Sequence, residues 1–334
     1  MTPLVSVIIP CRNEARFIAV CLDSILASDY PRFEVIVADG MSADGTREIV
    51  ARYGEVQMID NPRKITPAGL NLAIGAARGE IILRMDAHAR VARDYISGCV
   101  AALERTGADN VGGIRIEVAR DPGFFAAAIV EAMTQPFGVG NALYRTMADR
   151  EQWVDTVFGG CWRREIFCRI GMFHERLARS QDIEFNQRLR RAGGRILLSP
   201  ALVTYYYTRS WLRDLIRHNF VNGAWSVLPF ALTGGGMPVR WRHLAPLAMV
   251  STVCVCALAG FYWPAVAYAA ANLSASAWIA ARKKRWNYVL TLPVVFASLH
   301  FSYGTGSLWG LARIAAMSLV RSRAVRELDM EATR

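Results

Sequence analysis

The sequence predicts an α/β domain with a mainly parallel sheet and helices on both of its faces, followed by a hydrophobic helical region. Short β-branched runs alternate with helix-like stretches over the first 120 residues, and strand, helix, strand at this spacing is typical of a parallel sheet. Beyond residue 243 the chain contains two long runs without charged side chains. With 334 residues, of which 53% are apolar and 20% charged, the chain is large and apolar enough to bury a sizeable core.

The first half of the chain is predicted to contain four strands separated by four helices. The strands are expected at residues 5–9, 35–38, 81–83 and 111–116, and the helices at about 15–28, 44–53, 67–78 and 93–105. Parallel sheets bind ligands at the carboxyl ends of their strands. We therefore expect functional residues directly after the predicted strands.

Two uncharged runs, residues 244–281 and 286–312 apart from His300, dominate the second half. A spanning helix needs about 20 apolar residues, so the first run could form two spans broken at residues 261–264. The second run could form one long span or two short ones separated at residues 303–306, and we favour two hairpins. The alternative is a buried helical hairpin, although continuous apolarity leaves such a helix no polar face. The predicted regions are a sheet domain at 1–208, an interface region at 209–243, transmembrane helices at 244–320 and a basic tail at 321–334.

The charged residues bear on topology and on partners. Basic residues number 39 and acidic residues 28, and 36 of the basic residues are Arg; the excess fits either GC-rich coding or contacts with phosphates, which Arg binds bidentately. Two basic clusters, 282–285 and 321–326, are expected on the cytoplasmic side, which favours four spans over three. No basic arm, zinc spacing or RNA-binding string is present, which argues against nucleic acid as a partner.

Cysteine usage and the N-terminus predict where the sheet domain resides. The seven cysteines include no C-x-x-C pair, and their odd number argues against a disulfide framework and for a reducing compartment. The first residues lack the positive region and the long apolar run of a secretory signal. We therefore expect the sheet domain to be cytoplasmic.

A basic amphipathic helix is predicted after residue 208. Arg209, Arg213 and Arg217 recur every four residues, with Trp211, Leu212, Leu215, Ile216 and Phe220 on the other face. One interpretation is a helix on a membrane surface whose arginines, in particular Arg209 and Arg217, contact lipid phosphates or a diphosphate. The other is an ordinary solvated charged face.

Polar clusters follow three of the predicted strands. They are Pro10-Cys11-Arg12-Asn13-Glu14, then Asp39-Gly40-Met41-Ser42-Ala43-Asp44-Gly45-Thr46, and then Met85-Asp86-Ala87-His88. An aspartate at a strand end, such as Asp39, can accept hydrogen bonds from a ribose or a base N–H. No G-x-G-x-x-G follows the first strand, which argues against a dinucleotide site.

Asp86 and His88 lie two residues apart at a strand exit. From there both could approach one divalent ion alongside phosphate oxygens. The alternative is a turn carboxylate beside a solvated histidine, and the D-x-H pattern by itself does not decide between them.

Gly159 and Gly160, followed by Trp162, form a further candidate. Consecutive glycines indicate close approach of the backbone to a ligand, and the neighbouring aromatic ring could stack on a sugar. The alternative is a tight turn with a core tryptophan.

Five strings carry a resemblance to a known family. They are VSVIIPCRNE, VIVADGMSADGT, ARGEIILRMDAHA, FGGCWRREIF and SQDIEFNQRLRRAGG. In order and spacing they resemble the motifs of inverting family-2 glycosyltransferases with the GT-A fold, above all the ExoA-like glucosyltransferases of bacterial exopolysaccharide assembly. The resemblance covers roughly residues 4–225.

The resemblance implies roles for individual residues. Pro10, Arg12, Glu14, Asp39 and Asp86 would bind the nucleotide sugar. Asp86 and His88 occupy the D-x-D position that ligates Mn²⁺ or Mg²⁺, where an imidazole in place of a carboxylate favours Mn²⁺. Asp182 matches the second residue of the family's E-D signature, which supplies the general base, whereas the first residue is here Gln181.

The expected function follows from the resemblance. A membrane-anchored enzyme at the bacterial inner membrane would transfer one hexose, glucose from UDP-glucose, to a polyprenyl-diphosphate-linked saccharide. A processive polysaccharide synthase is an alternative, disfavoured because Q-x-x-R-W is missing and few spans are available for a product channel. A degenerate transferase acting as a membrane scaffold is the other, although Asp39, Asp86 and Asp182 are all retained.

Overall fold

The computed structural model describes residues 2–146, 148–233 and 241–332. The chain forms two compact units. The first, here called the sheet unit, comprises residues 1–120 and 133–208, and the second, the helical unit, comprises residues 121–132 and 209–334.

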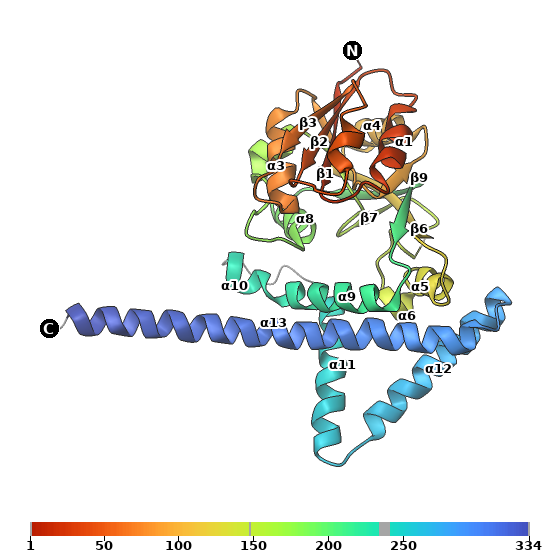
Figure 1. Cartoon of the computed structure of the whole chain (residues 1–334), viewed down its shortest axis with the longest axis vertical. Helices are drawn as coiled ribbons and strands as arrows, with labels where there is room; N and C mark the ends of the chain where they lie inside the picture. The colour runs from red at the N-terminus through yellow and green to blue at the C-terminus, as the bar shows by residue number, and fades with distance from the viewer. Residues whose placement is uncertain (1, 147, 234–240, 333–334) are drawn as a thin grey trace. The chain divides into compact units, whose positions relative to one another are not determined.

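The sheet unit contains one mixed, mainly parallel sheet, in agreement with the predicted α/β class (Figure 1). Its strands within the described residues are β1 Val5–Cys11, β2 Phe33–Asp39, β3 Val56–Asp60, β4 Ile81–Arg84, β5 Ala89–Val91, β6 Asn110–Ala119, β7 Gln152–Val154, β8 Cys161–Arg163 and β9 Ile196–Thr208. Their order is β3-β2-β1-β4-β8-β6-β9-β5, with β7 paired to β9. Strands β3, β2, β1 and β4 are mutually parallel, as are β6 and β9, and the short β5, β7 and β8 pair antiparallel.

Helices cover both faces of this sheet (Figure 1). The helices of the unit are α1 Ile18–Leu26, α2 Thr46–Val50, α3 Thr66–Ala76, α4 Tyr95–Thr106, α6 Pro136–Val139, α7 Glu165–Ile170 and α8 Gln181–Arg191. Helices α1, α2 and α4 contribute to one apolar core, whereas α3, α7 and α8 contribute to the other. The strands between them are aliphatic because they are buried on both sides.

The register of the parallel strands brings their carboxyl ends to one edge. Cys11 of β1 pairs with Asp39 of β2, and Asp39 pairs with Asp60 of β3. Arg84, the last residue of β4, pairs with Ile8. The polar residues that follow β1, β2 and β4 therefore lie along one edge, as the sequence predicts.

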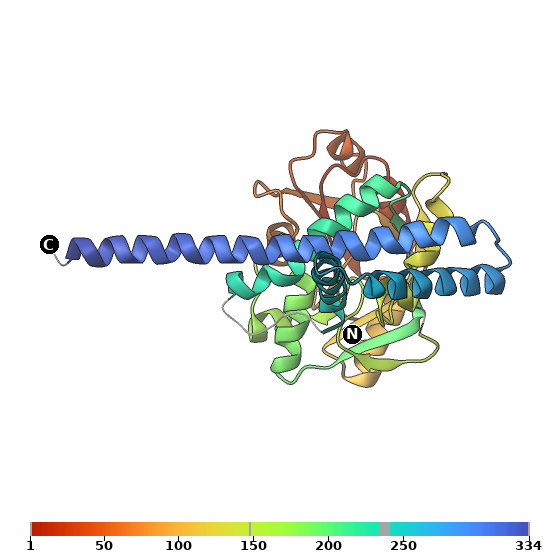
Figure 2. The same cartoon turned by 90° about the horizontal axis from the view of Figure 1, so that it is seen from below.

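The helical unit is built around one long helix (Figure 2). Its helices are α5 Ala126–Ala132, α9 Leu212–Val227, α10 Pro229–Thr233, α11 Trp241–Leu258, α12 Trp263–Lys283 and α13 Tyr288–Ala332. Helices α11 and α12 form a V whose turn lies at residues 259–262 (Figure 1). The side chains of residues 319–334, which include the basic tail, lie outside the described part.

Glycines on α9 and α13 let the backbones of these two helices touch. A Cβ on Gly306 would lie 2.7 Å from the Phe220 carbonyl carbon and nearer still to its oxygen, and one on Gly223 would overlap the Tyr303 carbonyl. The Ser307 hydroxyl donates to the Gly223 carbonyl oxygen at 3.1 Å. The predicted break at residues 303–306 is thus wrong, because its glycines serve close helix packing and α13 continues through them.

The two predicted transmembrane hairpins find no support in the residues that the structure describes, since none of their helices is both long enough and apolar enough to cross a bilayer. The reason is that an uncharged run is not necessarily an apolar one. Helix α12 carries Asn272, Ser274 and Ser276 among alanines, and α13 carries His300 and Ser302.

The amphipathic pattern predicted after residue 208 differs from the one observed. Helix α9 begins only at Leu212, so Arg209 precedes it. Arg213 and Arg217 are exposed as expected, but so are Trp211, Ile216 and Phe220. The buried side of α9 contains Leu215, Asn219, Gly223, Ala224, Ser226 and Val227. Small residues occupy much of it because α13 packs so closely.

Candidate active site

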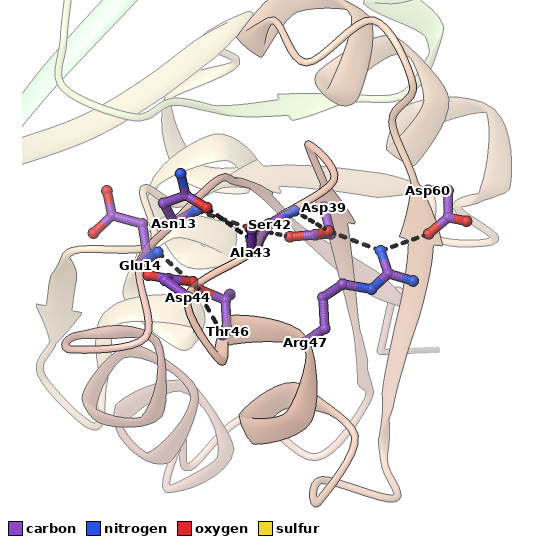
Figure 3. Close-up of polar contacts among 9 residues, drawn as sticks. All are labelled: Asn13, Glu14, Asp39, Ser42, Ala43, Asp44, Thr46, Arg47 and Asp60. Atoms are coloured by element: carbon purple, nitrogen blue, oxygen red, sulfur yellow. Dashed lines mark hydrogen bonds and ion pairs between the residues drawn. The ribbon is translucent and has the colours of Figure 1, made fainter.

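Asp39 is the centre of a buried hydrogen-bond network at the end of β2 (Figure 3). Its Oδ2 accepts from the Ser42 backbone N–H at 2.9 Å and from Arg47 Nη1 at 2.8 Å, and its Oδ1 accepts from the Ser42 hydroxyl at 2.5 Å. The residue is fully buried. A buried carboxylate is stable only with such partners, and Ser42 and Arg47 supply them.

The loop after β1 is tied to the loop after β2 (Figure 3). The Asn13 backbone N–H donates to the Ser42 hydroxyl at 2.8 Å, and the Ala43 N–H donates to Asn13 Oδ1 at 3.0 Å. The Glu14 N–H donates to Thr46 Oγ1 at 2.8 Å. The residues around Arg12 and Glu14 are therefore held against the Asp39 loop before any ligand arrives.

Asp44 fixes the turn that leads into α2. Its carboxylate accepts from the Ala15 and Thr46 backbone N–H groups, each at 3.1 Å, and from the Thr46 hydroxyl. Burial would raise the pKa of Asp44, but these hydrogen bonds outweigh it and hold the pKa below its usual value. The first residues of α2 are thereby fixed relative to β2.

Backbone strain gathers at the same edge. Asn13, Met41 and Lys64 have φ angles of 55°, 57° and 59°, and they follow β1, β2 and β3. Ser180, with a φ of 60°, immediately precedes α8. Such conformations cost about 1 to 3 kcal/mol each in non-glycine residues and cluster at functional sites.

Asp86 follows β4 and is paired with a buried arginine. Arg84 Nη2 donates to Asp86 Oδ1 at 3.0 Å, and the Asp86 side chain is 18% exposed. Burial would raise the pKa of Asp86, but the charges of Arg84 and His88 outweigh it and lower the pKa overall. Asp86 is therefore an ionised carboxylate that remains partly open to solvent.

Asp182 lies at the start of α8, and its negative charge influences the pKa of Arg84. Burial would lower the pKa of Arg84, but the negative charges of Asp86 and then Asp182 outweigh it and raise the pKa. The Ile183 backbone N–H donates to Asp182 Oδ1 at 2.9 Å. The structure thus brings Asp86 and Asp182 into one electrostatic environment around Arg84. Glu184, one turn into the helix, is bound instead by Arg188.

His88 is held by two partners. Its Nδ1 lies 2.8 Å from Glu14 Oε1, and its Nε2 lies 2.7 Å from the Tyr206 hydroxyl. Burial would lower the pKa of His88, but the contacts with Tyr206 and Glu14 outweigh it and raise the pKa to about 9. In this arrangement neither ring nitrogen is open to a metal, and Glu14 is engaged with His88.

The predicted cluster at Gly159, Gly160 and Trp162 has a different role. A Cβ on Gly159 would lie 2.8 Å from the Arg84 carbonyl oxygen, and the Gly160 carbonyl accepts the Arg84 N–H at 2.9 Å. Trp162 is 2% exposed and packs edge-on against Phe167, Phe173 and Phe185. Of the two interpretations of Trp162, the structure agrees with the second, a core tryptophan beside a tight turn.

The remaining predicted residues lie at the edge or outside this unit. Pro10 lies within β1 opposite Ala38, and Arg12 is exposed with its stem against Gly40. Arg209 and Arg217 belong to the helical unit.

Several residues of the site were not predicted. Arg84 lies inside the string ARGEIILRMDAHA, and Arg47 directly follows VIVADGMSADGT. A charged residue at the end of an aliphatic strand is a signal that could have identified Arg84. Tyr206 comes from β9, 118 residues after His88, and no local sequence pattern predicts its contact with His88. Arg115 and Glu117 form a buried ion pair on β6, and the Arg115 guanidinium lies 4.1 Å from the Tyr206 ring centroid.

Comparisons with known proteins agree with the sequence resemblance. The model of Glycosyl transferase family 2 matches residues 6–169. The succinoglycan biosynthesis protein ExoA of Rhizobium meliloti is 31% identical over 313 residues, covering 90% of this chain and 92% of ExoA. A dolichyl N-acetyl-alpha-D-glucosaminyl phosphate 3-beta-D-2,3-diacetamido-2,3-dideoxy-beta-D-glucuronosyltransferase of Methanococcus voltae is 24% identical over 234 residues, covering 66% of this chain and 72% of that protein.

A solved structure shares the architecture. The mannosyltransferase PcManGT from Pyrobaculum calidifontis, solved in complex with GDP-Man and Mn²⁺, has a TM-score of 0.60 at 24% identity, covering 92% of this chain and 88% of that chain. The likeness shows a GT-A-like α/β fold. The match to ExoA and the match to the family model place the chain in glycosyl transferase family 2. The protein is accordingly a glycosyltransferase.

Proposed function

We propose that this glycosyltransferase moves a single hexose, glucose from UDP-glucose, onto a polyprenyl-diphosphate-linked saccharide during exopolysaccharide biosynthesis. The observation that carries the proposal is Asp86, paired with the buried Arg84 at the carboxyl edge of the sheet, together with Asp182, whose negative charge also raises the pKa of Arg84. The similarity to ExoA, named for succinoglycan biosynthesis, supports the kind of product. UDP as the nucleotide rests on the resemblance of the sequence to ExoA-like glucosyltransferases.

The reaction we propose is a single displacement with inversion. An acceptor hydroxyl oxygen forms a bond to the anomeric carbon while the bond from that carbon to the diphosphate oxygen breaks, and the electron pair leaves with UDP. Asp182 accepts the hydroxyl proton. Asp182 is half-buried, and its Oδ1 already accepts the Ile183 N–H, which leaves Oδ2 for the proton.

The chain's cations help the leaving group. Arg84 is buried and paired with Asp86, and the buried Arg115 packs against the Tyr206 ring. Fixed positive charge in a site of low dielectric stabilises a developing anion without reorganisation. We propose that this is their contribution to departure of the nucleotide.

A divalent metal fits the site through Asp86. Mg²⁺ and Mn²⁺ are commonly held by one or two carboxylates together with substrate phosphates. No three His, Cys, Asp or Glu side chains converge on a metal position within the described residues, so the donor diphosphate would complete the coordination. Because both nitrogens of His88 are engaged, we assign Asp86 as the metal-binding residue, with His88 restraining Glu14. When bound, the metal would neutralise charge on the diphosphate.

The place of action we propose is the cytoplasmic surface of a bacterial inner membrane. Support comes from the helical unit, where Trp263, the first residue of α12, is 77% exposed and Trp286, in the turn after α12, is 72% exposed. Exposed Arg282, Lys284 and Arg285 lie between Trp278 and Trp286. Aromatic and basic side chains together are typical of segments that lie in the headgroup region.

The experiment that tests the proposed function is a transfer assay with a panel of nucleotide sugars and polyprenyl-diphosphate-linked saccharides. We expect transfer from UDP-glucose and a product with inverted anomeric configuration. Transfer only from another nucleotide sugar would refute the assigned donor. Failure of the purified protein to bind any nucleotide sugar would favour the scaffold alternative.

A further inference from the structure

The first turn of α8 depends on the irregular loop that precedes it. Asp182 is the second residue of this helix, and residues 171–180 connect α7 to it. Ser180, with its φ of 60°, leads directly into the helix, and such a conformation persists only where the surrounding structure holds it. The contacts that hold this loop therefore also fix the place of Asp182.

Arg188, further along α8, binds the beginning of this loop. Its Nη1 donates to the carbonyl oxygens of Ile170 and Gly171, the latter at 3.1 Å, and its Nη2 donates to the Met172 carbonyl oxygen at 2.9 Å. The last carbonyls of a helix have no partner within that helix, and α7 ends at Ile170. Arg188 thus supplies these carbonyls with donors and ties the end of α7 to α8.

Glu184 orients the Arg188 guanidinium from the same helix. Arg188 Nε donates to Glu184 Oε1 and Nη2 donates to Glu184 Oε2, each at 2.9 Å. Together with the three carbonyl contacts, these bonds occupy all five N–H donors of the guanidinium. The Glu184 backbone N–H donates in turn to the Ser180 carbonyl oxygen at 3.0 Å. A guanidinium whose donors are all used in this way holds structure rather than substrate.

Asn71 of α3 holds the next residue of the loop. The Phe173 backbone N–H donates to Asn71 Oδ1 at 3.0 Å, and Asn71 Nδ2 donates to the Phe173 carbonyl oxygen at 2.9 Å. The buried Phe173 ring stacks on Phe185 of α8, with ring centroids 4.6 Å apart. Because these contacts do not involve Arg188, we expect the core around the loop to survive a conservative change at Arg188.

Arg188 engages one of two acidic residues that lie two positions apart. Glu184 is paired with Arg188 at 2.9 Å, whereas the charge of Asp182 raises the pKa of Arg84. Successive residues of a helix are rotated by about 100°, so the side chains of Asp182 and Glu184 leave α8 in different directions. Arg188 therefore fixes the turn that carries the proposed base without binding the base itself.

We propose that Arg188 is a positioning residue for sugar transfer. By binding the end of α7 and Glu184 together, it fixes the first turn of α8 and with it the place of Asp182. The inference rests on the proposed function, because it takes Asp182 as the general base. A displacement of about 1 Å in a catalytic group can slow a reaction about 100-fold, so a residue remote from the substrate can control the rate.

The test is a double-mutant cycle of Arg188→Lys and Asp182→Asn. The kcat and the KM for UDP-glucose are measured by transfer of radiolabelled glucose to a polyprenyl-diphosphate-linked saccharide. Lysine keeps a charge beside Glu184 but cannot bind three carbonyls and a carboxylate together. Arg190→Lys is the matched control, since Arg190 is exposed on the same helix. Thermal unfolding followed by circular dichroism shows whether each variant is folded at the assay temperature.

The expected result is an effect of Arg188→Lys that depends on Asp182. In the otherwise wild-type protein, kcat should fall about 10- to 100-fold, while the KM for UDP-glucose stays within about twofold because no donor contact is lost. In the Asp182→Asn background the same substitution should change kcat by less than about twofold, since the base that it positions is already gone. Arg190→Lys should match its parent in both backgrounds.

Glu184→Gln is the second variant, used if Arg188→Lys is not folded at the assay temperature. Glutamine keeps one acceptor for Arg188 and replaces the other by an amide nitrogen, which cannot accept. We expect kcat to fall by a smaller factor than in Arg188→Lys, and again only where Asp182 is present.

Two results would overturn the inference alone. One is wild-type kcat in Arg188→Lys, or in Glu184→Gln if that is the folded variant. The other is a loss of kcat beyond about twofold in the Asp182→Asn background as well, which would mean that Arg188 supports the fold rather than the base. If Asp182→Asn transfers at the wild-type rate, or the wild type transfers no sugar, the proposed function fails and the inference with it. Both of these outcomes come from proteins that retain Arg188, so they are distinguishable from a failure of the inference alone.

Discussion

The close contact between α9 and α13 predicts that two chemically identical substitutions have opposite effects. Gly306→Ala places a Cβ 2.7 Å from the Phe220 carbonyl carbon and closer to its oxygen. These are backbone atoms, which cannot rotate aside. Gly75→Ala in α3 places a Cβ in open space.

The magnitudes follow from these surroundings. Forcing an extra carbon into a packed interface costs about 1 to 3 kcal/mol, because α13 must move away from α9 and give up the Ser307 contact with Gly223. Alanine in place of an exposed helical glycine stabilises by about 0.5 to 1 kcal/mol. The free energies of unfolding of the two variants should therefore differ by roughly 1.5 to 4 kcal/mol.

Urea unfolding followed by circular dichroism measures this difference. Gly306→Ala should unfold at lower urea than the wild type, and Gly75→Ala at equal or higher urea. If Gly306→Ala were as stable as the wild type, the contact between the two helices would be wrong. A loss of stability in Gly75→Ala would contradict the reasoning that an added Cβ with no atom nearby does not destabilise the helix.

Two further predictions concern Asp182 and Trp162. Asp182→Asn keeps the hydrogen bond from the Ile183 N–H but removes the proton acceptor. Transfer should therefore slow by about 10²- to 10⁴-fold, while the affinity for UDP-glucose stays unchanged. Transfer at the wild-type rate would mean that another residue is the base. Trp162→Phe should lower the free energy of unfolding by about 0.5 to 3 kcal/mol. Because the ring is buried, the KM for the acceptor should stay within about twofold. A raised acceptor KM at unchanged stability would support sugar stacking by Trp162.

Four strands of the sheet could be predicted because their signals are local, whereas β3 Val56–Asp60, also parallel, was not predicted. The aliphatic runs that became β1, β2, β4 and β6 are each followed by polar turns, and the helices between them have ordinary lengths. The three-residue strands β5, β7 and β8 are too short for any periodicity. The long strand β9 contains Pro200 and three consecutive tyrosines, Tyr205 to Tyr207, which conceal its alternation.

The site was predictable where the chain runs directly from strand to turn. Asp39 and Asp86 were placed at the edge because strand ends in a parallel sheet must meet there. Their partners depend on tertiary structure. Tyr206 reaches His88 only because β5 pairs with β9, and the burial that makes Asp39 depend on Arg47 is a property of the folded loop.

The helical unit shows where sequence patterns mislead. Absence of charge in residues 244–281 and 286–312 predicts membrane spans, but it does not measure apolarity, since the helices formed there within the described residues also contain serine, threonine and glycine. Gly304 and Gly306, expected to break a helix, instead allow neighbouring backbones to approach α13. From the sequence alone, a glycine can indicate either the end of a helix or close packing between helices. Only the packing in the structure distinguishes the two.

The most direct test of the account is a calorimetric titration of UDP-glucose into the wild type and into Asp86→Ala, each in Mn²⁺ and in EDTA. The carboxylate of Asp86 is the partly exposed acid at the strand edge to which we assign the metal. We predict wild-type binding in Mn²⁺ that is lost or strongly weakened in EDTA, and weak binding of Asp86→Ala in both. Equal wild-type affinity with and without the metal, or metal-dependent binding that survives in Asp86→Ala, would contradict the assignment of this edge as the donor site.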